Sequence, residues 1–283
     1  MIVNKIGRVF DALNLGYHSQ RRASLDFRSF RVEFLGDKFF LPKYSYVYKA
    51  LRRNIGKALH QYDMISDGDR ILVGLSGGKD SFTLLWMLKD RLKHIPINYT
   101  LYSVHIDLGF NGKFSQSLAE YCDQLGFKLK IEKTDYGILA HSSENRENPC
   151  FLCSRLRRKR LFEIANELGC NKLALGHNKD DIIETLFMNM CYAGEISSMM
   201  PSQSFFQGKY TLIRPLAFVD EDTIRRFADE KGCPDFLNPC PSANISKRQE
   251  IKKMLKQLYR RNKKVKGNIF RAMHHVKMDY MPK

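Results

Sequence analysis

Several features of other protein classes are missing from this 283-residue sequence. It has no run of about 18 apolar residues, so it predicts no helix that spans a membrane. The N-terminus lacks the apolar core of a secretory signal peptide. Seven cysteines, an odd number, are not typical of a secreted disulfide scaffold. These absences favour a protein that works in the cytoplasm.

Acidic residues are scarce: 30 Asp and Glu stand against 47 Lys and Arg, which gives a formal net charge of +17. Such an excess favours a polyanionic partner, and nucleic acid is the first candidate. A solvated basic surface without a specific partner is the alternative. Basic residues crowd a predicted helix at 44–61 and the stretch 247–266. We expect RNA contacts from Arg52, Arg53, Lys57, Arg158, Lys252, Lys256, Arg260 and Arg261.

The most informative stretch is an apolar, strand-prone run at 71–75 followed by Ser76-Gly77-Gly78-Lys79-Asp80-Ser81 and then a helical pattern. A strand, a glycine loop and a helix N-terminus together form a cradle for an anion, because backbone N–H groups and the helix dipole point at one spot. The glycines allow close approach of a phosphate. A glycine-rich turn without a ligand is the alternative reading.

This loop is not an ordinary P-loop, because Val73 and Asp80 stand where that pattern needs Gly and Ser or Thr. It also fails the dinucleotide-binding fingerprint, because Ser76 replaces the second Gly. It resembles the SGGxDS loop of the PP-loop ATP pyrophosphatases. That resemblance implies cleavage of ATP into pyrophosphate and an adenylated substrate.

Strand-like and helical patterns alternate along the chain, which indicates an α/β fold with a parallel, Rossmann-like sheet flanked by helices. We expect strands at 71–75, 97–109, 128–133, 172–176 and 212–216. Residues 27–41 are expected to form a short hairpin or, as an equally good account, to belong to a poorly ordered tail. A loop is expected over 194–211, followed later by a helix capped by Ser246 and Gln249 with Ile251, Leu255 and Leu258 facing inward. In a parallel sheet, ligands bind at the carboxyl ends of the strands. The sequences 76–81, 105–109 and 176–181 all fall at predicted strand ends.

The second polar signature, Gly176-His177-Asn178-Lys179-Asp180-Asp181, follows a predicted strand and opens a helix. Paired carboxylates beside a phosphate site hold Mg²⁺ or orient a nucleophile. His177 as a core or capping residue, with Asp180 and Asp181 as partners of the helix dipole, is the alternative. We also expect His105 and Asp107, with Gly176 and His177, to line the nucleotide site.

Cys150 and Cys153 form a CxxC motif placed just before a predicted helix, and Cys240 lies far downstream. A single CxxC is compatible with zinc, with redox exchange or with no function. Structural zinc requires four ligands, whereas three thiolates suit a site with one open position. A [4Fe–4S] cluster held by three cysteines leaves one iron open to sulfide. Packing roles are expected for Cys122, Cys170 and Cys191.

Four motifs, SGGKDS, PCxxCSRLRR, LALGHNKDD and PCPSANISKR, occur in this order, and with them the chain resembles the tRNA 2-thiocytidine synthetase family from about Arg52 to about Lys277. The resemblance implies 2-thiocytidine formation at position 32 of tRNA with ATP, Mg²⁺ and a [4Fe–4S] cluster held by Cys150, Cys153 and Cys240. Arg157 occupies the place where related 2-thiouridine enzymes look to have a catalytic Lys. Zinc-binding cysteine pairs of those relatives are absent here, which favours the cytidine branch. The implied catalytic residues are Lys79, Asp80, Arg157, Asp180 and Asp181.

The expected organisation is an extension at 1–44, a basic helix at 45–66, a PP-loop and thiolation domain at 67–245, and a basic helical segment at 246–283. The expected partners are a tRNA anticodon stem-loop and, as sulfur source, a cysteine desulfurase or inorganic sulfide. The sequence leaves a homodimer open. The alternatives are a 2-thiouridine-type thiolase, a cluster-free persulfide sulfurtransferase and, more distantly, a non-catalytic RNA-binding protein with a nucleotide fold.

Overall fold

The computed structural model describes residues 33–35, 38–40, 44–110, 113–234, 236, 240–242 and 246–280. The chain divides into two compact units, Met1–Ser45 and Tyr46–Lys283. In the first unit, β1 (Glu33–Leu35) and β2 (Lys38–Phe40) pair in antiparallel register, with Phe34 opposite Phe39. This is the hairpin expected around residues 36 and 37, while 27–32 and 41 lie outside the described residues.

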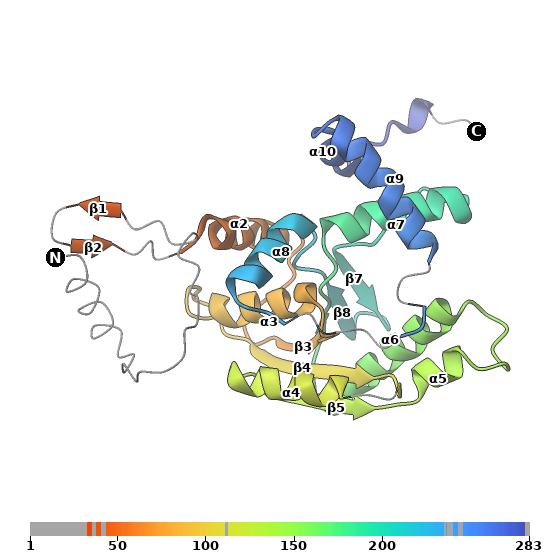
Figure 1. Ribbon diagram of the computed structural model, residues 1–283, viewed down its shortest axis with the longest axis horizontal. Coiled ribbons are helices and arrows are strands. Elements are labelled where there is room, and N and C mark those ends of the chain that lie inside the picture. Colours follow the sequence, from red (N-terminus) through yellow and green to blue (C-terminus); the bar gives the residue numbers. More distant parts are fainter. Residues whose placement is uncertain are drawn as a thin grey trace, which may run out of the picture. The chain divides into compact units, whose positions relative to one another are not determined.

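The second unit is built on a six-stranded sheet with the order β5-β4-β3-β6-β8-β7 (Figure 1). Its strands are β3 (Arg70–Gly74), β4 (Thr100–Asp107), β5 (Leu129–Lys133), β6 (Lys172–Ala174), β7 (Ser202–Phe205) and β8 (Tyr210–Ile213). All neighbours pair in parallel except β7, which runs antiparallel to β8 at the edge. The expectation of an α/β fold with a largely parallel sheet is therefore confirmed.

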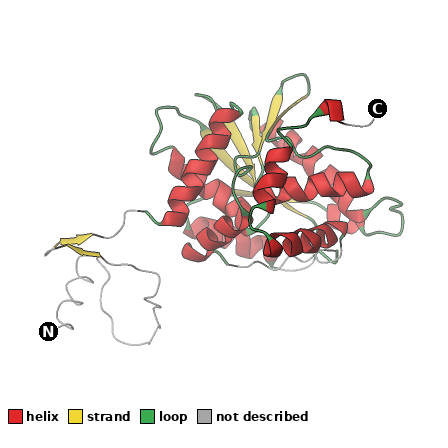
Figure 2. Cartoon of the chain, turned by 90° about the horizontal axis from the view of Figure 1, so that it is seen from above, coloured by secondary structure: helices red, strands yellow, loops and turns green. Residues whose placement is uncertain are grey.

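Helices surround these strands, as Figure 2 shows. They are α2 (Tyr46–Gln61), α3 (Lys79–Arg91), α4 (Phe114–Gln124), α5 (Tyr136–Ala140), α6 (Pro149–Glu167), α7 (Lys179–Tyr192), α8 (Glu221–Glu230), α9 (Lys247–Arg261) and α10 (Val265–Ala272), followed by a short 3₁₀ turn, Met278–Tyr280. Helices α2, α3 and α8 pack together. Helices α9 and α10 pack on α7 around Ile183, Ile251 and Leu255. None of the helices in the described part of the chain is long and apolar enough to cross a membrane.

The sheet core explains why the central strands read as unbroken apolar runs. Ile71, Leu72 and Val73 of β3 are fully buried, as expected for a parallel strand covered on both faces. Leu72 shares one hydrophobic cluster with Leu173 of β6 and with Ile164 of α6. Helix α6 connects two parallel strands, so its N-terminal half lies at the edge where those strands end.

That carboxyl edge collects the three polar sequences singled out above. Strand β3 pairs with β4 on one side and β6 on the other, in register from Gly74 opposite Val104 to Val73 opposite Ala174. The loops after these strands therefore emerge side by side. The chain order reverses between β3 and β6, which is the switch point where open α/β sheets bind ligands.

Several local expectations are wrong. The segment 194–211 is not wholly a loop, because 202–205 pairs as an edge strand whose polar composition gave little strand signal. Ser246 is the N-cap of α9 but forms no side-chain capping hydrogen bond, and Leu258 is exposed because it lies away from the contact with α7.

Two expectations about cysteines also fail. Cys191 is exposed, whereas Cys122 and Cys170 are buried as expected for packing residues. The CxxC motif lies inside α6 and not before it, because Pro149 takes the first helical position and the Asn148 side chain accepts hydrogen bonds from the backbone of Cys150 and Phe151.

Candidate active site

The glycine loop between β3 and α3 is held by its own hydroxyl groups. The Ser81 hydroxyl donates to the carbonyl of Gly78 at 2.9 Å and accepts from the backbone N–H of Ser76 at 3.2 Å. Gly78 is the N-cap of α3 and makes no side-chain capping bond. The first N–H groups of this helix are thus directed at the loop, which is the arrangement that binds phosphate at a helix N-terminus.

Gly77 has a backbone conformation that other residues rarely adopt, with φ +84°. A Cβ atom at this position would lie 2.6 Å from Cζ of Phe114. Gly176 is equally confined, since its Cβ would approach the backbone N of Ser81 to 3.0 Å. Glycine at position 77 therefore makes room for Phe114 of α4, and glycine at position 176 lets the loop after β6 approach the start of α3.

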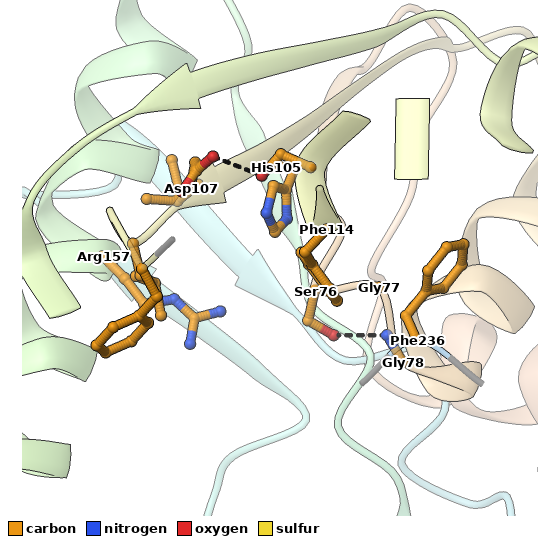
Figure 3. Close-up of a pocket in the computed structure, with 12 residues that line it drawn as sticks. Ser76, Gly77, Gly78, His105, Asp107, Phe114, Arg157 and Phe236 are labelled. Carbon is orange, nitrogen blue, oxygen red and sulfur yellow. Dashed lines mark hydrogen bonds between the residues drawn. The ribbon is translucent and has the colours of Figure 1, made fainter. Parts of the chain in front are cut away.

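A pocket of about 190 Å³ lies beside the loop. Its wall combines the loop itself with aromatic and polar side chains from the ends of β4, α4 and α6, as Figure 3 shows for Phe114, His105 and Arg157. The Arg157 guanidinium is directed into the pocket toward Ser76. An aromatic wall next to a phosphate cradle suits a purine nucleotide, whose flat base stacks on such rings.

His105 and Asp107 line this pocket, and both are fixed by hydrogen bonds. Nδ1 of His105 lies 2.8 Å from the carbonyl oxygen of Leu75, and burial holds the pKa of His105 below its ordinary value. Asp107 accepts hydrogen bonds from the Ser115 hydroxyl at 2.6 Å and from the Gly109 N–H at 3.0 Å. Burial alone acts to raise the pKa of Asp107, but these hydrogen bonds outweigh it and lower that pKa.

Lys79 and Asp80 belong to one network that joins the glycine loop to the second signature. Nζ of Lys79 lies 3.3 Å from Asp80 and 3.1 Å from Oε1 of Glu221. The Asn178 side chain donates to the other oxygen of Asp80 at 2.8 Å. Although burial opposes it, the two carboxylates raise the pKa of Lys79, so the ammonium stays charged.

The C-terminal helices neutralise the paired carboxylates of the second signature. Lys266 of α10 lies 2.6 Å from Asp180, and Arg248 of α9 lies 3.3 Å from Asp181. Asp181 also accepts from the backbone N–H of Asn178 at 2.9 Å, which completes a capping box at the start of α7. Asp181 therefore caps the start of its own helix, which is the structural role that the sequence left open. Among the described residues, the Asp180 carboxylate is bound by groups outside α7, namely Lys266 and the backbone N–H of Glu221.

Lys252 lies in this network and not on the exposed face of α9. Its Nζ is 2.9 Å from Oε2 of Glu221 and 3.8 Å from Glu184. The other expected RNA contacts, Arg52, Arg53 and Lys57 on α2 and Lys256, Arg260 and Arg261 on α9, are exposed. Lys252 is thus a neighbour of the nucleotide loop, and the exposed cations of α2 and α9 remain available for phosphates.

His177 lies deep at the end of β6. Burial, and then the charges of nearby arginines with Arg214 first, lower the pKa of His177 to about 3. Its Nδ1 accepts a hydrogen bond from Nε of Arg214 at 3.3 Å. His177 is consequently neutral and positions Arg214.

The cysteines lie on the α6 side of the pocket. Cys150 and Cys153 are three residues apart in the first turns of α6 and so share a face. Burial raises the pKa of Cys153, Arg157 opposes that shift, and the Cys240 and Cys150 thiols add to it, so all three thiols lie within electrostatic range. Within the described ranges, no three His, Cys, Asp or Glu side chains converge closely enough to form a metal site.

The comparisons with known proteins agree with this arrangement. Residues 47–258 match the PP-loop domain. The chain belongs to the PP-loop family. A tRNA-cytidine(32) 2-sulfurtransferase from Escherichia coli O127:H6 is 44% identical over 230 residues, which cover 81% of this chain and 74% of that protein. The protein of the same name from E. coli strain K12 gives the same values.

One solved structure extends the likeness. The U34-tRNA thiolase NcsA from Methanococcus maripaludis, with its [4Fe-4S] cluster, superposes with a TM-score of 0.70 at 26% identity and covers 83% of this chain and 81% of that one. The 44% identity to the E. coli proteins places the chain, within the PP-loop family, among the tRNA 2-thiocytidine synthetases. The expectation drawn from the four motifs is thus confirmed.

Sequence reasoning missed several residues of this PP-loop site. Glu221, Lys266 and Arg248 reach the nucleotide loop and its carboxylates from elements far along the chain. Their only sequence signal was the acidic start of α8 and the basic composition of α9 and α10. Phe236, stacked against Phe82 at 6.0 Å, completes the aromatic wall from a loop that gave no signal.

Replacing Gly77 by Ala should damage the loop more than replacing Gly78. Gly77→Ala forces a strained φ and a clash with Phe114, at a cost of about 1–2 kcal/mol or more. Gly78→Ala places its Cβ 3.6 Å from the nearest atom, at φ −82°. Thermal unfolding measures the stability of the two variants, and binding of a non-hydrolysable ATP analogue measures the state of their loops. Equal losses of stability in the two variants would contradict this geometry.

Glu221 should make the protein sensitive to acid. Burial opposes its ionisation, yet Lys252 and Lys79 hold the pKa of Glu221 at about 2, below its unfolded value of about 4.3. A depressed folded pKa contributes stability above the unfolded pKa, and that contribution is lost as the pH falls from about 4.3 to 2. The difference in free energy of unfolding between the wild type and Glu221→Gln should therefore shrink over this window.

Urea unfolding at a series of pH values measures that difference. Asp222→Asn is the matched control, because Asp222 is the next residue on α8 and pairs only with exposed Arg225. A wild-type advantage over Glu221→Gln that stays constant down to pH 2 would contradict the assignment.

Proposed function

We propose that this chain is an ATP-dependent tRNA sulfurtransferase that replaces the C2 oxygen of cytidine 32 with sulfur. The observation that carries the proposal is the SGGKDS loop at the switch point of the sheet, flanked by the CxxC helix in a chain 44% identical to the E. coli sulfurtransferases. An exposed basic surface on α2 and α9 supports a tRNA substrate.

ATP binds with its phosphates on the glycine loop and its base against the aromatic wall. The loop amides and Lys79 neutralise the phosphate oxygens, which gives catalysis by positioning and electrostatic stabilisation. Phosphates take the place of Asp80 and Glu221 as partners of Lys79. The cytidine O2 attacks the α-phosphorus, the bond to the β-phosphate oxygen breaks, and pyrophosphate leaves.

The C2 atom then carries an AMP ester, which is a far better leaving group than a carbonyl oxygen. Addition of sulfide at C2 and departure of AMP complete the exchange. The sulfur source is inorganic sulfide, or the persulfide of a cysteine desulfurase that a thiol reductant cleaves to sulfide with its own oxidation to a disulfide. Arg157, which faces the loop across the pocket, stabilises negative charge on the departing phosphate.

Two groups complete the site when bound. Carboxylate oxygens of Asp180 and Asp181 suit Mg²⁺, which prefers oxygen ligands, and Lys266 and Arg248 now neutralise these oxygens. Cys150 and Cys153 in the first turns of α6, with Cys240 in electrostatic range of Cys153, would supply the three thiolates that suit a [4Fe–4S] cluster. A cluster with three protein ligands supplies one iron that can bind sulfide.

The RNA must present its base outside the helical stack. A pocket of about 190 Å³ beside the loop does not admit a base that remains stacked in an RNA duplex. The exposed arginines and lysines of α2 and α9 hold the backbone through phosphates, so tRNA binding should weaken with salt.

Cytidine is favoured over uridine because the protein named for uridine 34 is only 26% identical, against 44% for those named for cytidine 32. A persulfide route through the CxxC motif remains the rival for sulfur delivery. It needs thiols but no iron.

Cysteine variants distinguish the two routes. Cys150→Ser should lose both iron binding and thiolation of tRNA, because it removes a thiolate ligand. Cys191→Ser should retain both, since Cys191 is exposed on α7, away from α6. Anaerobically purified protein is assayed for iron and, with ATP, Mg²⁺, sulfide and tRNA, for 2-thiocytidine by nucleoside mass spectrometry. Thiolation by a Cys150→Ser protein without iron would sink the cluster scheme, and 2-thiouridine as product would sink the cytidine assignment.

A further inference from the structure

Arg214 is a buried cation to which the described part of the chain offers no carboxylate partner. It directly follows β8, and only 7% of its surface is exposed. Its guanidinium donates to Nδ1 of neutral His177 and to the carbonyl oxygen of Met200. Among the described residues, no Asp or Glu oxygen lies within 4.0 Å of it. Burial, together with the charge of Arg158, lowers the pKa of Arg214 to about 10.

Two further arginines lie close by and are equally unneutralised. Arg157 and Arg158 stand next to each other on α6, and neither forms a hydrogen bond or an ion pair with any described residue. Arg157 reaches the pocket beside the glycine loop, whereas Arg158 is exposed. After burial, and after the charges of Arg214 and Arg248, both contribute to the low pKa of His177, so both lie within electrostatic range of that imidazole.

The topology explains why they meet. Strands β6 and β8 are parallel neighbours, with Ala174 opposite Ile213, so His177 and Arg214 leave the sheet at the same edge. The N-terminal half of α6 reaches this edge and brings Arg157 and Arg158. Other cations around the loop are matched by acids, as Lys79 is by Glu221 and Lys266 by Asp180. In the part of the chain that the structure describes, the lack of a countercharge around the loop is specific to the α6 side.

Burying a guanidinium without a countercharge lowers the stability of the folded protein, and repulsion from cationic neighbours lowers it further. A bound anion removes it, and the planar fork of Arg matches the oxygens of a phosphate. We propose that Arg158 and Arg214 form a clamp for a phosphodiester of the substrate RNA, next to the nucleotide whose base enters the pocket that Arg157 lines. This inference rests on the proposed tRNA substrate.

The two arginines of the clamp lie apart from the place where the phosphates of ATP bind. Those phosphates have their own cradle in residues 76–81 with Lys79, on the α3 side of the switch point. Arg158 and Arg214 lie on the α6 side, and exposed Arg158 opens the clamp to solvent, where a polymer backbone can pass. A phosphate held here fixes the distance between the RNA strand and the pocket.

Binding of tRNA and of ATP to charge-removing variants tests the clamp. Arg158→Gln and Arg214→Gln should each weaken tRNA binding about tenfold and reduce the slope of log affinity against log salt by about 1. Arg214→Lys should restore part of the affinity. ATP affinity without tRNA should not change. Arg155→Gln is the control on the same helix, because Glu147 already neutralises Arg155 at 3.3 Å, and it should bind tRNA almost normally.

The clamp would be overturned if Arg158→Gln, a surface variant that keeps the fold, bound tRNA as well as the wild type. It would also be overturned if Arg155→Gln lost as much tRNA affinity as Arg158→Gln. A loss of ATP affinity with tRNA affinity intact would assign the phosphate to the nucleotide instead. A wild-type protein that binds no tRNA would instead refute the proposed function.

Discussion

Parallel pairing of β3 with β4 on one side and β6 on the other is the constraint from which the site follows. It brings three loops, at 76–81, 105–109 and 176–181, to one edge of the sheet at the point where the chain order reverses. Glycine at position 176 lets the loop after β6 approach the backbone of Ser81, and glycine at position 77 makes room for Phe114 of α4. Because α6 returns the chain from β5 to β6, its N-terminal turns bring the cysteines and arginines to the same edge.

Charge is distributed unequally over this edge. On the α7 and α8 side, Lys79, Glu221, Lys252 and Asp180 form linked ion pairs, and cations of α9 and α10 provide many of the partners. Such pairs hold in place charged groups that can exchange partners with the phosphates of a nucleotide. On the α6 side, the arginines lack acidic partners among the described residues. The first side suits metal and nucleotide, and the second suits an anionic substrate that enters from solvent.

The sequence predicted those parts of the molecule whose signal is local. Apolar runs such as 71–73 identified buried parallel strands, and the glycine pair at 77–78 identified the phosphate loop. The edge strand at 202–205 was missed, because its SQSF sequence carries little apolar signal and antiparallel pairing to β8 determines it. Glu221 and Arg214 could not be assigned from sequence, since their roles depend on side chains 142 and 37 positions away. The Ser246 capping box had the right residues but did not form, because local pattern alone does not set side-chain orientation.

The central claim is that this edge joins ATP to the oxygen at C2 of a tRNA cytidine before sulfur enters. The most direct measurement follows that oxygen. An anticodon stem-loop RNA with oxygen-18 at C2 of cytidine 32 is incubated with the anaerobic protein, ATP, Mg²⁺ and sulfide, and the released AMP is analysed by mass spectrometry. The account predicts AMP that carries one oxygen-18 atom for each 2-thiocytidine formed. Unlabelled AMP alongside 2-thiocytidine would contradict it.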